Sequence, residues 1–311
     1  MTTMTPSATD RRQQTAAPVA ATAADPAIAT GSVTSNDGTT IGYLRFGSGP
    51  SIVVYHGAMT SARSFTELAG DLATRHTVYV PDRRDRGLSG PFPADYSIET
   101  EVADLEAVLD ASGAHDVFAI SAGALVAMQT ALTDPRIERL ALYEPALSVN
   151  GSLEPALDRL DQQIAAGNAA GALVTGMLEA DLGPPIFKVM PRALLERMTS
   201  STMKSEEKKA APGDVTMRML APTQHYDFEL IHEESGTLEH YRALTAKVLL
   251  LGGSKSPGWA RVALDALEKT IPNATRLELD GLDHGGPTNP SAINRASNPG
   301  EVADALGRFF A

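Results

Sequence analysis

The sequence predicts an α/β fold: a doubly wound, mostly parallel sheet with helices on both faces and a helical cap inserted between two strands. Short apolar runs alternate with helical segments along much of the 311 residues, which is typical of a parallel sheet. Runs such as VFAI and VLLL are apolar on both faces, as strands covered from both sides must be. One long segment, 148–243, shows periodic apolar residues but no clear strand.

The individual elements follow from the pattern in chain order. Two strand-like runs flank Asn36-Asp37-Gly38, and Asp-Gly between such runs favours a hairpin. Buried strands are expected at 51–57, 76–82, 116–121, 139–145, 247–253 and 275–281. Helices are expected near 62–74, 98–112, 122–133, 258–270 and 299–310.

These elements divide the chain into three regions. Residues 1–31 are rich in Ala, Thr and Pro and poor in large apolar side chains, so they cannot offset the entropy of ordering. We expect them to be a disordered tail. Residues 32–147 and 244–311 form the α/β core, and residues 148–243 form the helical cap. Within the cap, SEEKKAAPGD (205–214) is expected to be an exposed loop.

The composition disfavours nucleic acid and membranes as partners and excludes chemistry that needs cysteine. A net charge of −12 disfavours nucleic acid and anionic membranes as partners, because both reward clustered Lys and Arg. The segment DRRDR (82–86) is a mixed-charge turn rather than such a cluster. Absence of cysteine excludes disulfides and thiolate metal sites and is compatible with a cytoplasmic location. No apolar run approaches the roughly 18 residues of a membrane span. We expect a small-molecule substrate, no metal and no cofactor, and leave the oligomeric state open.

Three residues with catalytic potential follow predicted strands. In open α/β sheets the reactive groups gather at the carboxyl ends of the strands. Ser121, Glu144 and His284 follow the third, fourth and last buried strands in that chain order. A histidine with a pKa near about 6.5 can take a proton from a serine hydroxyl and return it. The alternative for Ser121 is an ordinary helix N-cap.

Several motifs in the right order resemble the α/β-hydrolase superfamily. They are VVYHGAMTSARSF, YVPDRRDRGLSG, YSIETEVADLEAVLDASG, AISAGAL and PNATRLELDGLDHGG, and the resemblance covers residues 32–146 and 244–311. It makes AISAGAL the nucleophile elbow, with Ala119 in place of the first glycine of G-x-S-x-G. The resemblance implies that Ser121 is the nucleophile and His284 the general base. It also implies an oxyanion hole made by the backbone N–H groups of Ala58 and Ala122.

The triad acid departs from the pattern of most relatives. They carry it after the strand that corresponds to 247–253, where this chain has GGSKSPGW. Some branches of the superfamily place the acid at the end of the preceding strand, and Glu144 occupies that position. Asp283, or no carboxylate at all, remains an alternative. Asp265 lies well into the next predicted helix and is expected to face solvent.

The resemblance implies a hydrolase that cleaves a small-molecule ester, thioester or lactone through an acyl-enzyme. A non-hydrolytic enzyme of the same fold (a lyase, a cyclase or a cofactor-free peroxidase) and a non-catalytic ligand-binding module stay open, because fold does not fix function. The substrate is expected to bind in an apolar pocket under the cap, lined by Met59, Met177, Phe187, Met190, Tyr226 and Phe228.

Overall fold

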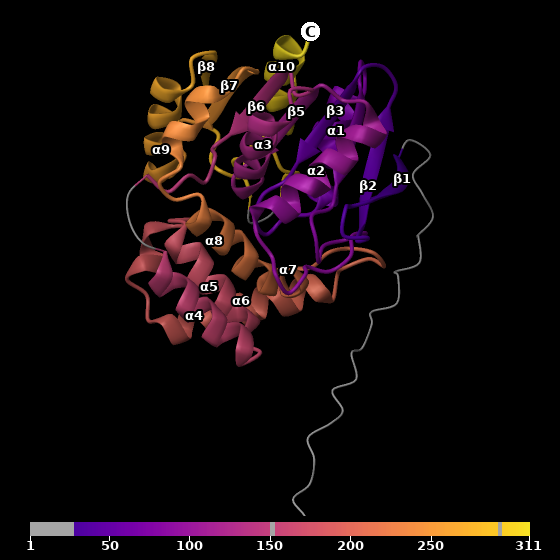
Figure 1. The fold of residues 1–311 in the computed structure, drawn as a ribbon. Coiled ribbons are helices and arrows are strands. Elements are labelled where there is room, and N and C mark those ends of the chain that lie inside the picture. The colour runs from indigo at the N-terminus through magenta and orange to yellow at the C-terminus, as the bar shows by residue number, and fades with distance from the viewer. Residues whose placement is uncertain (1–27, 150–152, 292–293) are drawn as a thin grey trace, which may run out of the picture.

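A mostly parallel sheet lies between helices in the computed structural model, which describes residues 28–149, 153–291 and 294–311 (Figure 1). The eight strands have the order β1-β2-β4-β3-β5-β6-β7-β8. The neighbours from β4 to β8 pair in parallel, whereas β2 pairs antiparallel with both β1 and β4. The predicted α/β fold with a doubly wound sheet is confirmed.

The strands lie close to their predicted positions. The hairpin at Asn36-Asp37-Gly38 joins β1 to β2. Residues 28–31, which the sequence analysis placed in the tail, belong to β1. Their pairing with β2 is made by the backbone, which a count of large apolar side chains does not detect; the rest of the predicted tail lies outside the described residues. The strands are β1 (Ile28–Thr34), β2 (Thr40–Gly47), β3 (Ser51–Tyr55), β4 (Thr77–Pro81), β5 (Asp116–Ile120), β6 (Arg139–Tyr143), β7 (Lys247–Gly253) and β8 (Ala274–Leu279).

Helices cover both faces of the sheet. Alternate residues of β5 point to opposite sides, so that Val117 packs in the cluster with α2, α3 and α9, and Phe118 in the cluster with α1 and α10. Gly113 ends α2 with a φ of 60°, where a side chain would be strained. The core helices are η1 (Ala62–Phe65), α1 (Thr66–Leu72), α2 (Ile98–Ser112), α3 (Ala122–Thr133), α9 (Gly258–Thr270) and α10 (Pro299–Phe309).

Between β6 and β7 the described chain is helical and contains no strand, as the sequence pattern predicted. We call residues 153–243 the helical insertion, and Figure 1 shows its helices gathered below the sheet. Helix α6 runs through Glu207, so the first part of the predicted loop at 205–214 is helical instead. The elements are α4 (Glu154–Ala165), α5 (Ala169–Glu179), η2 (Pro185–Lys188), α6 (Arg192–Glu207), α7 (Met217–Leu220), η3 (Ala221–Thr223), α8 (Gln224–Glu233) and η4 (Leu238–Ala243).

The helical insertion is attached to the loops at the carboxyl ends of the parallel strands. Asp227 of α8 binds Arg83 and Arg86, which follow β4. Trp259, which follows β7, donates its indole N–H to the carbonyl of Ala180 at 2.7 Å. The insertion therefore lies at the edge of the sheet where the sequence places the candidate site.

Candidate active site

Ser121 forms the turn between β5 and α3 in a backbone conformation that side chains rarely adopt. Its φ is 56° and its ψ is −124°, and strain of this kind is typical of functional turns. The turn is closely packed, because a Cβ on Gly123 would come within 2.2 Å of the carbonyl oxygen of His56. Ala119, where most relatives have glycine, is fully buried in the core. Its extra methyl group is thus accommodated.

The hydroxyl of Ser121 faces a histidine rather than capping helix α3. It makes no capping hydrogen bond, and its Oγ lies 3.1 Å from Nε2 of His284. On the other side of the ring, Nδ1 lies 2.7 Å from Oε2 of Glu144. An ionised carboxylate can only accept, so Nδ1 carries the proton of the neutral ring and Nε2 is left to accept from the hydroxyl. The structure therefore brings the three predicted residues into one chain of hydrogen bonds.

Glu144 is held by the same turn that lacks the usual acid. Its side chain is fully buried, and Oε1 accepts the N–H of Gly253 at 2.9 Å and the hydroxyl of Ser256. Gly253 is the last residue of β7, and Ser256 belongs to the turn that follows it. Hydrogen bonds to an ionised carboxylate are stronger than those between neutral groups. The end of β7 and its turn thus supply donors to a carboxylate that comes from the end of β6.

The other two carboxylates considered point elsewhere. Asp283 accepts the N–H of Gly285 with Oδ1 at 2.9 Å, and its backbone carbonyl accepts the hydroxyl of Tyr143 at 2.7 Å. Asp265 pairs with Arg276 and is 57% exposed, as expected for a solvent-facing residue. Among the described residues, Glu144 is the carboxylate that hydrogen-bonds the candidate base.

Two backbone N–H groups flank Ser121. Ala122 begins α3, where the first N–H groups of a helix lack an intrahelical acceptor and the helix dipole favours negative charge. Ala58 follows Gly57, and a Cβ on Gly57 would lie 2.8 Å from the Cβ of Ser121. This placement agrees with the predicted oxyanion hole, which stays a prediction.

The peptide that carries the Ala58 N–H is held by two side chains. Nε2 of His56 accepts the N–H of Arg83 at 3.1 Å, so Nδ1 carries the ring proton and faces the Gly57 carbonyl at 3.0 Å. Thr60 donates its hydroxyl to the same carbonyl at 2.9 Å. Burial and two nearby arginine charges lower the pKa of His56 well below its usual value, which keeps the ring neutral. In a trans peptide the C=O and N–H point in opposite directions, so these two donors fix the direction of the Ala58 N–H.

The mixed-charge turn after β4 is buried rather than solvated. Arg83 binds Glu101 of α2 and Asp227 of α8, each at 2.6 Å, and Arg86 binds Asp227 at 2.7 Å. These four side chains are fully buried. Burial by itself would raise the pKa of Glu101, but the charge and hydrogen bonds of Arg83 outweigh it and hold the pKa below its usual value. Sequence analysis missed this cluster, because the partners are far apart along the chain.

The residues predicted to form an apolar pocket do not coincide with the lining of a cavity at the edge of the helical insertion. Phe228 packs in the insertion's own small core with Leu160 and Ala172, and its role as a substrate contact stays a prediction. Tyr226 stacks on Phe92 with ring centroids 3.8 Å apart. A cavity of about 830 Å³ opens between α6, the loop before α7 and two core loops, and most of the residues that line it are of polar type. None of the predicted substrate contacts lines it: Met59, Met177, Phe187, Met190, Tyr226 and Phe228.

Metal binding and membrane spans were considered for the described residues, 28–149, 153–291 and 294–311. Nowhere in these ranges do three or more His, Asp or Glu side chains gather in a way that could hold a metal ion. The helices of the same ranges are all too short or too polar to cross a membrane.

Comparison with known proteins identifies similar chains. The model of the "Alpha/beta hydrolase family" matches residues 52–305. An alpha/beta hydrolase from Sphaerobacter thermophilus is 30% identical, with a TM-score of 0.71 over 90% of this chain and 100% of that one. A hydrolase from Pseudomonas aeruginosa is 20% identical, with a TM-score of 0.65 over 91% of this chain and 98% of that one. A thermophilic esterase from Thermogutta terrifontis, with malate bound, is 16% identical, with a TM-score of 0.67 over the same shares. The last two show the fold alone.

Proposed function

The chain belongs to the alpha/beta hydrolase family and is a hydrolase of that type, and we propose that it cleaves a small-molecule ester, thioester or lactone through a serine nucleophile. The observation that carries the proposal is the hydrogen-bond chain from Ser121 through His284 to Glu144, with distances of 3.1 and 2.7 Å. A serine hydroxyl is a weak nucleophile at neutral pH, and a base within this reach activates it.

In the acylation step, Ser121 Oγ forms a bond to the carbonyl carbon of the substrate while His284 Nε2 takes the hydroxyl proton. The carbonyl oxygen becomes an oxyanion and accepts the backbone N–H groups of Ala58 and Ala122. The carbon–oxygen or carbon–sulfur bond to the leaving group then breaks. The leaving alcohol or thiol departs with the proton that His284 held.

In the deacylation step, a water molecule gives a proton to His284 as its oxygen attacks the acyl carbon. The bond to Ser121 Oγ breaks, Oγ recovers the proton from His284, and the carboxylic acid leaves. Through both steps Glu144 holds Nδ1 of the ring and stabilises the imidazolium that forms.

We also propose that residues 148–243 act as a cap over this centre; residues 150–152 of that range lie outside the described chain. The support is that α8 and the end of α5 are attached to loops at the carboxyl ends of β4 and β7. A cap at this edge would exclude water from the acyl-enzyme except where the substrate enters.

The missing carboxylate after β7 made a non-hydrolytic enzyme of the same fold less remote. Glu144 provides a buried carboxylate on His284 from β6, and this favours serine hydrolysis over a lyase, a cyclase, a peroxidase or a binding module. The test is hydrolysis of p-nitrophenyl acetate by the Ser121→Ala variant. We expect activity to fall to the background rate, and unchanged activity would contradict the proposal.

A further inference from the structure

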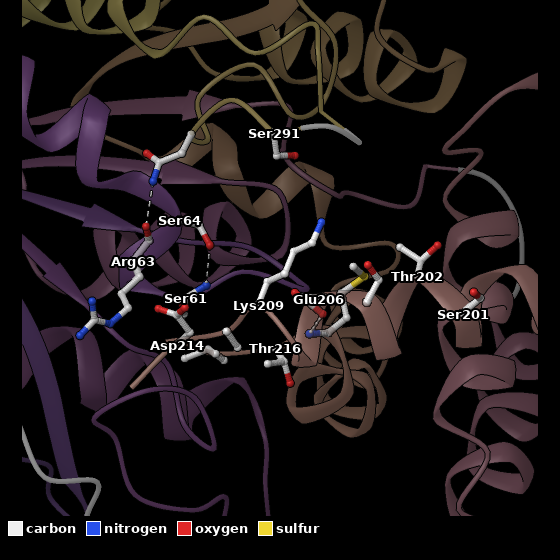
Figure 2. Close-up of a pocket in the computed structure, with 15 residues that line it drawn as sticks. Ser61, Arg63, Ser64, Ser201, Thr202, Glu206, Lys209, Asp214, Thr216 and Ser291 are labelled. Atoms are coloured by element: carbon white, nitrogen blue, oxygen red, sulfur yellow. Dashed lines mark hydrogen bonds between the residues drawn. The ribbon is translucent and has the colours of Figure 1, made fainter. Parts of the chain in front are cut away.

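A polar cavity lies where the helical insertion meets two loops of the core (Figure 2). Its volume is about 830 Å³, within the range of about 300–1,000 Å³ that is usual for small-molecule sites. The insertion contributes residues of α6 and of the chain between α6 and α7. The core contributes residues of η1 and of the loop that follows His284.

The cavity and the candidate catalytic centre share both core loops. Ser61, which lines it, follows Ala58 by three residues, so their Cα atoms are at most about 11 Å apart. Asn289, which also lines it, lies five residues after His284 and donates its backbone N–H to the carbonyl of Ser64 at 2.8 Å. The loop of the base and the loop of the oxyanion hole therefore meet at the wall of the cavity.

The lining of the cavity is rich in hydroxyl groups, because it includes five serines and two threonines. An apolar ligand here would strip water from these hydroxyls without replacing its hydrogen bonds. The cavity is thus suited to a hydrophilic group.

One cation of the lining is available to a ligand. Figure 2 shows the side chain of Lys209 extending toward the middle of the cavity, whereas the guanidinium of Arg63 points away. The ammonium of Lys209 makes no hydrogen bond or ion pair with any residue that the structure describes. The lining carboxylates are engaged with the backbone: Glu206 accepts the N–H of Met217 at 2.9 Å and Asp214 that of Ala211 at 2.7 Å.

We propose that this polar cavity binds an anionic oxygen group, a carboxylate or a phosphate, carried by the substrate whose carbonyl Ser121 attacks. The inference rests on the proposed function. An ammonium and several hydroxyls offer charge-assisted and neutral hydrogen bonds to anionic oxygens. In a chain with a net charge of −12, the free ammonium of Lys209 provides local attraction for an anion, which the lining carboxylates of Glu206 and Asp214 and the acidic surface oppose.

The test compares two esters that differ only at the far end of the acyl chain. The p-nitrophenyl ester of butyric acid ends in a methyl group, and the p-nitrophenyl monoester of succinic acid ends in a carboxylate. We expect the wild-type protein to show a higher kcat/KM for the succinate ester. The preference should fall about tenfold in Lys209→Met, mostly through KM, because one charge-assisted contact is lost. Lys208→Met, a neighbouring lysine outside the lining, should keep the wild-type preference.

Added succinate and added inorganic phosphate, each as an inhibitor of butyrate-ester hydrolysis, distinguish the two kinds of anion. Competitive inhibition by one of them that Lys209→Met weakens supports the cavity and identifies the anion. The measured quantity is the ratio of kcat/KM for the succinate ester to kcat/KM for the butyrate ester. A ratio near one in the wild-type protein, or a ratio that Lys209→Met leaves unchanged, would overturn the inference without contradicting the proposed hydrolysis. If neither ester is cleaved, the proposed function fails. Calorimetric binding of succinate or phosphate to the protein, with and without Lys209→Met, then still tests the cavity.

Discussion

Glu144 and Gly253 lie at the ends of neighbouring parallel strands and are joined by a hydrogen bond of 2.9 Å from the Gly253 N–H to Oε1. The second oxygen of the same carboxylate faces Nδ1 of His284 at 2.7 Å. The end of β7, where most relatives have the acid itself, therefore provides a donor to Glu144. A carboxylate that follows β6 is thus held against the imidazole, as the prediction of Glu144 as the triad acid requires.

Replacing Glu144 by Gln tests this arrangement without changing the size of the side chain. An amide can keep an oxygen for Gly253, but its NH₂ group then faces the N–H of His284, so the ring loses its orientation. We expect kcat for p-nitrophenyl acetate to fall by roughly two to four orders of magnitude with little change in KM. Asp283→Asn is the matched control and should stay within about threefold of wild type. If kcat of Glu144→Gln also stays within about threefold of wild type, Glu144 is not the triad acid. The acid would then be Asp283, or the site would be a serine–histidine pair without an acid.

The grouping of Ser121, Glu144 and His284 could be predicted from the sequence because each follows a strand, although the last strand, β8, lies at the edge of the sheet and is only partly buried. Parallel strands bring their carboxyl ends to one edge, so Ser121, Glu144 and His284 had to be neighbours once the strands were recognised. The choice among the carboxylates could not be made from the pattern. It depends on the direction in which the side chains leave β6 and the last loop, which the hydrogen bonds of Glu144 and Asp283 reveal.

Other features depend on contacts between distant parts of the chain. Arg83 and Asp227 are 144 residues apart, and a run of charges gives no sign that it will be buried. The lining of the polar cavity likewise comes from η1, from α6 and its following loop, and from the loop after His284. Among the residues of the insertion that were predicted to face a substrate, Phe228 packs against Leu160 and Ala172 in the insertion's own core.

Thr60 is expected to support the oxyanion hole through the Gly57 carbonyl. Thr60→Val keeps the shape of the side chain and removes the hydroxyl donor at 2.9 Å. The loss of one hydrogen bond, worth about 0.5–1.5 kcal/mol, should lower kcat by roughly two- to tenfold while KM changes little. Thr74→Val removes a hydroxyl bond to the carbonyl of Asp71 on the surface and should leave kcat at the wild-type value. Equal kcat values for the two variants would show that Thr60 has no such role.

His56 should make the stability of the protein depend on pH. Because its pKa is lowered in the folded state, the unfolded chain takes up a proton below about pH 6.5 that the folded chain does not. This contribution to the free energy of unfolding is therefore present at neutral pH and lost as the pH falls, by up to about 1.4 kcal/mol per pH unit. Asp82 has the opposite effect on the free energy of unfolding. Burial raises its pKa to about 6, so as the pH falls the folded chain takes up this proton before the unfolded chain does.

Comparison with His56→Gln isolates the histidine, because Asp82 is present in both proteins. We expect the variant to be less stable than wild type near pH 7, and the difference in free energy of unfolding to narrow by about 1–2 kcal/mol toward pH 5. Urea unfolding at both pH values measures this difference. A difference that stays constant or widens would mean that His56 takes up a proton in the folded protein.

The ion pairs of Asp227 should contribute strongly to the attachment of the helical insertion. Asp227→Ala would leave Arg83 and Arg86 buried without this partner, which should cost about 3–5 kcal/mol of unfolding free energy. Glu239→Ala removes an exposed pair with Arg242, whose side chains are 70% and 63% exposed, and should cost less than about 1 kcal/mol. Urea unfolding measures both variants. Similar losses in the two would contradict a special role for the buried cluster.

The central claim is that Ser121 is the nucleophile, and reaction with a fluorophosphonate tests it most directly. Mass spectrometry of the intact protein counts the adducts, and analysis of the digested peptides locates them. We expect one adduct, on Ser121, at a rate that falls by orders of magnitude in His284→Ala, and no adduct in Ser121→Ala. A folded wild-type protein that stays unlabelled, or an adduct on another residue that persists in Ser121→Ala, would contradict it.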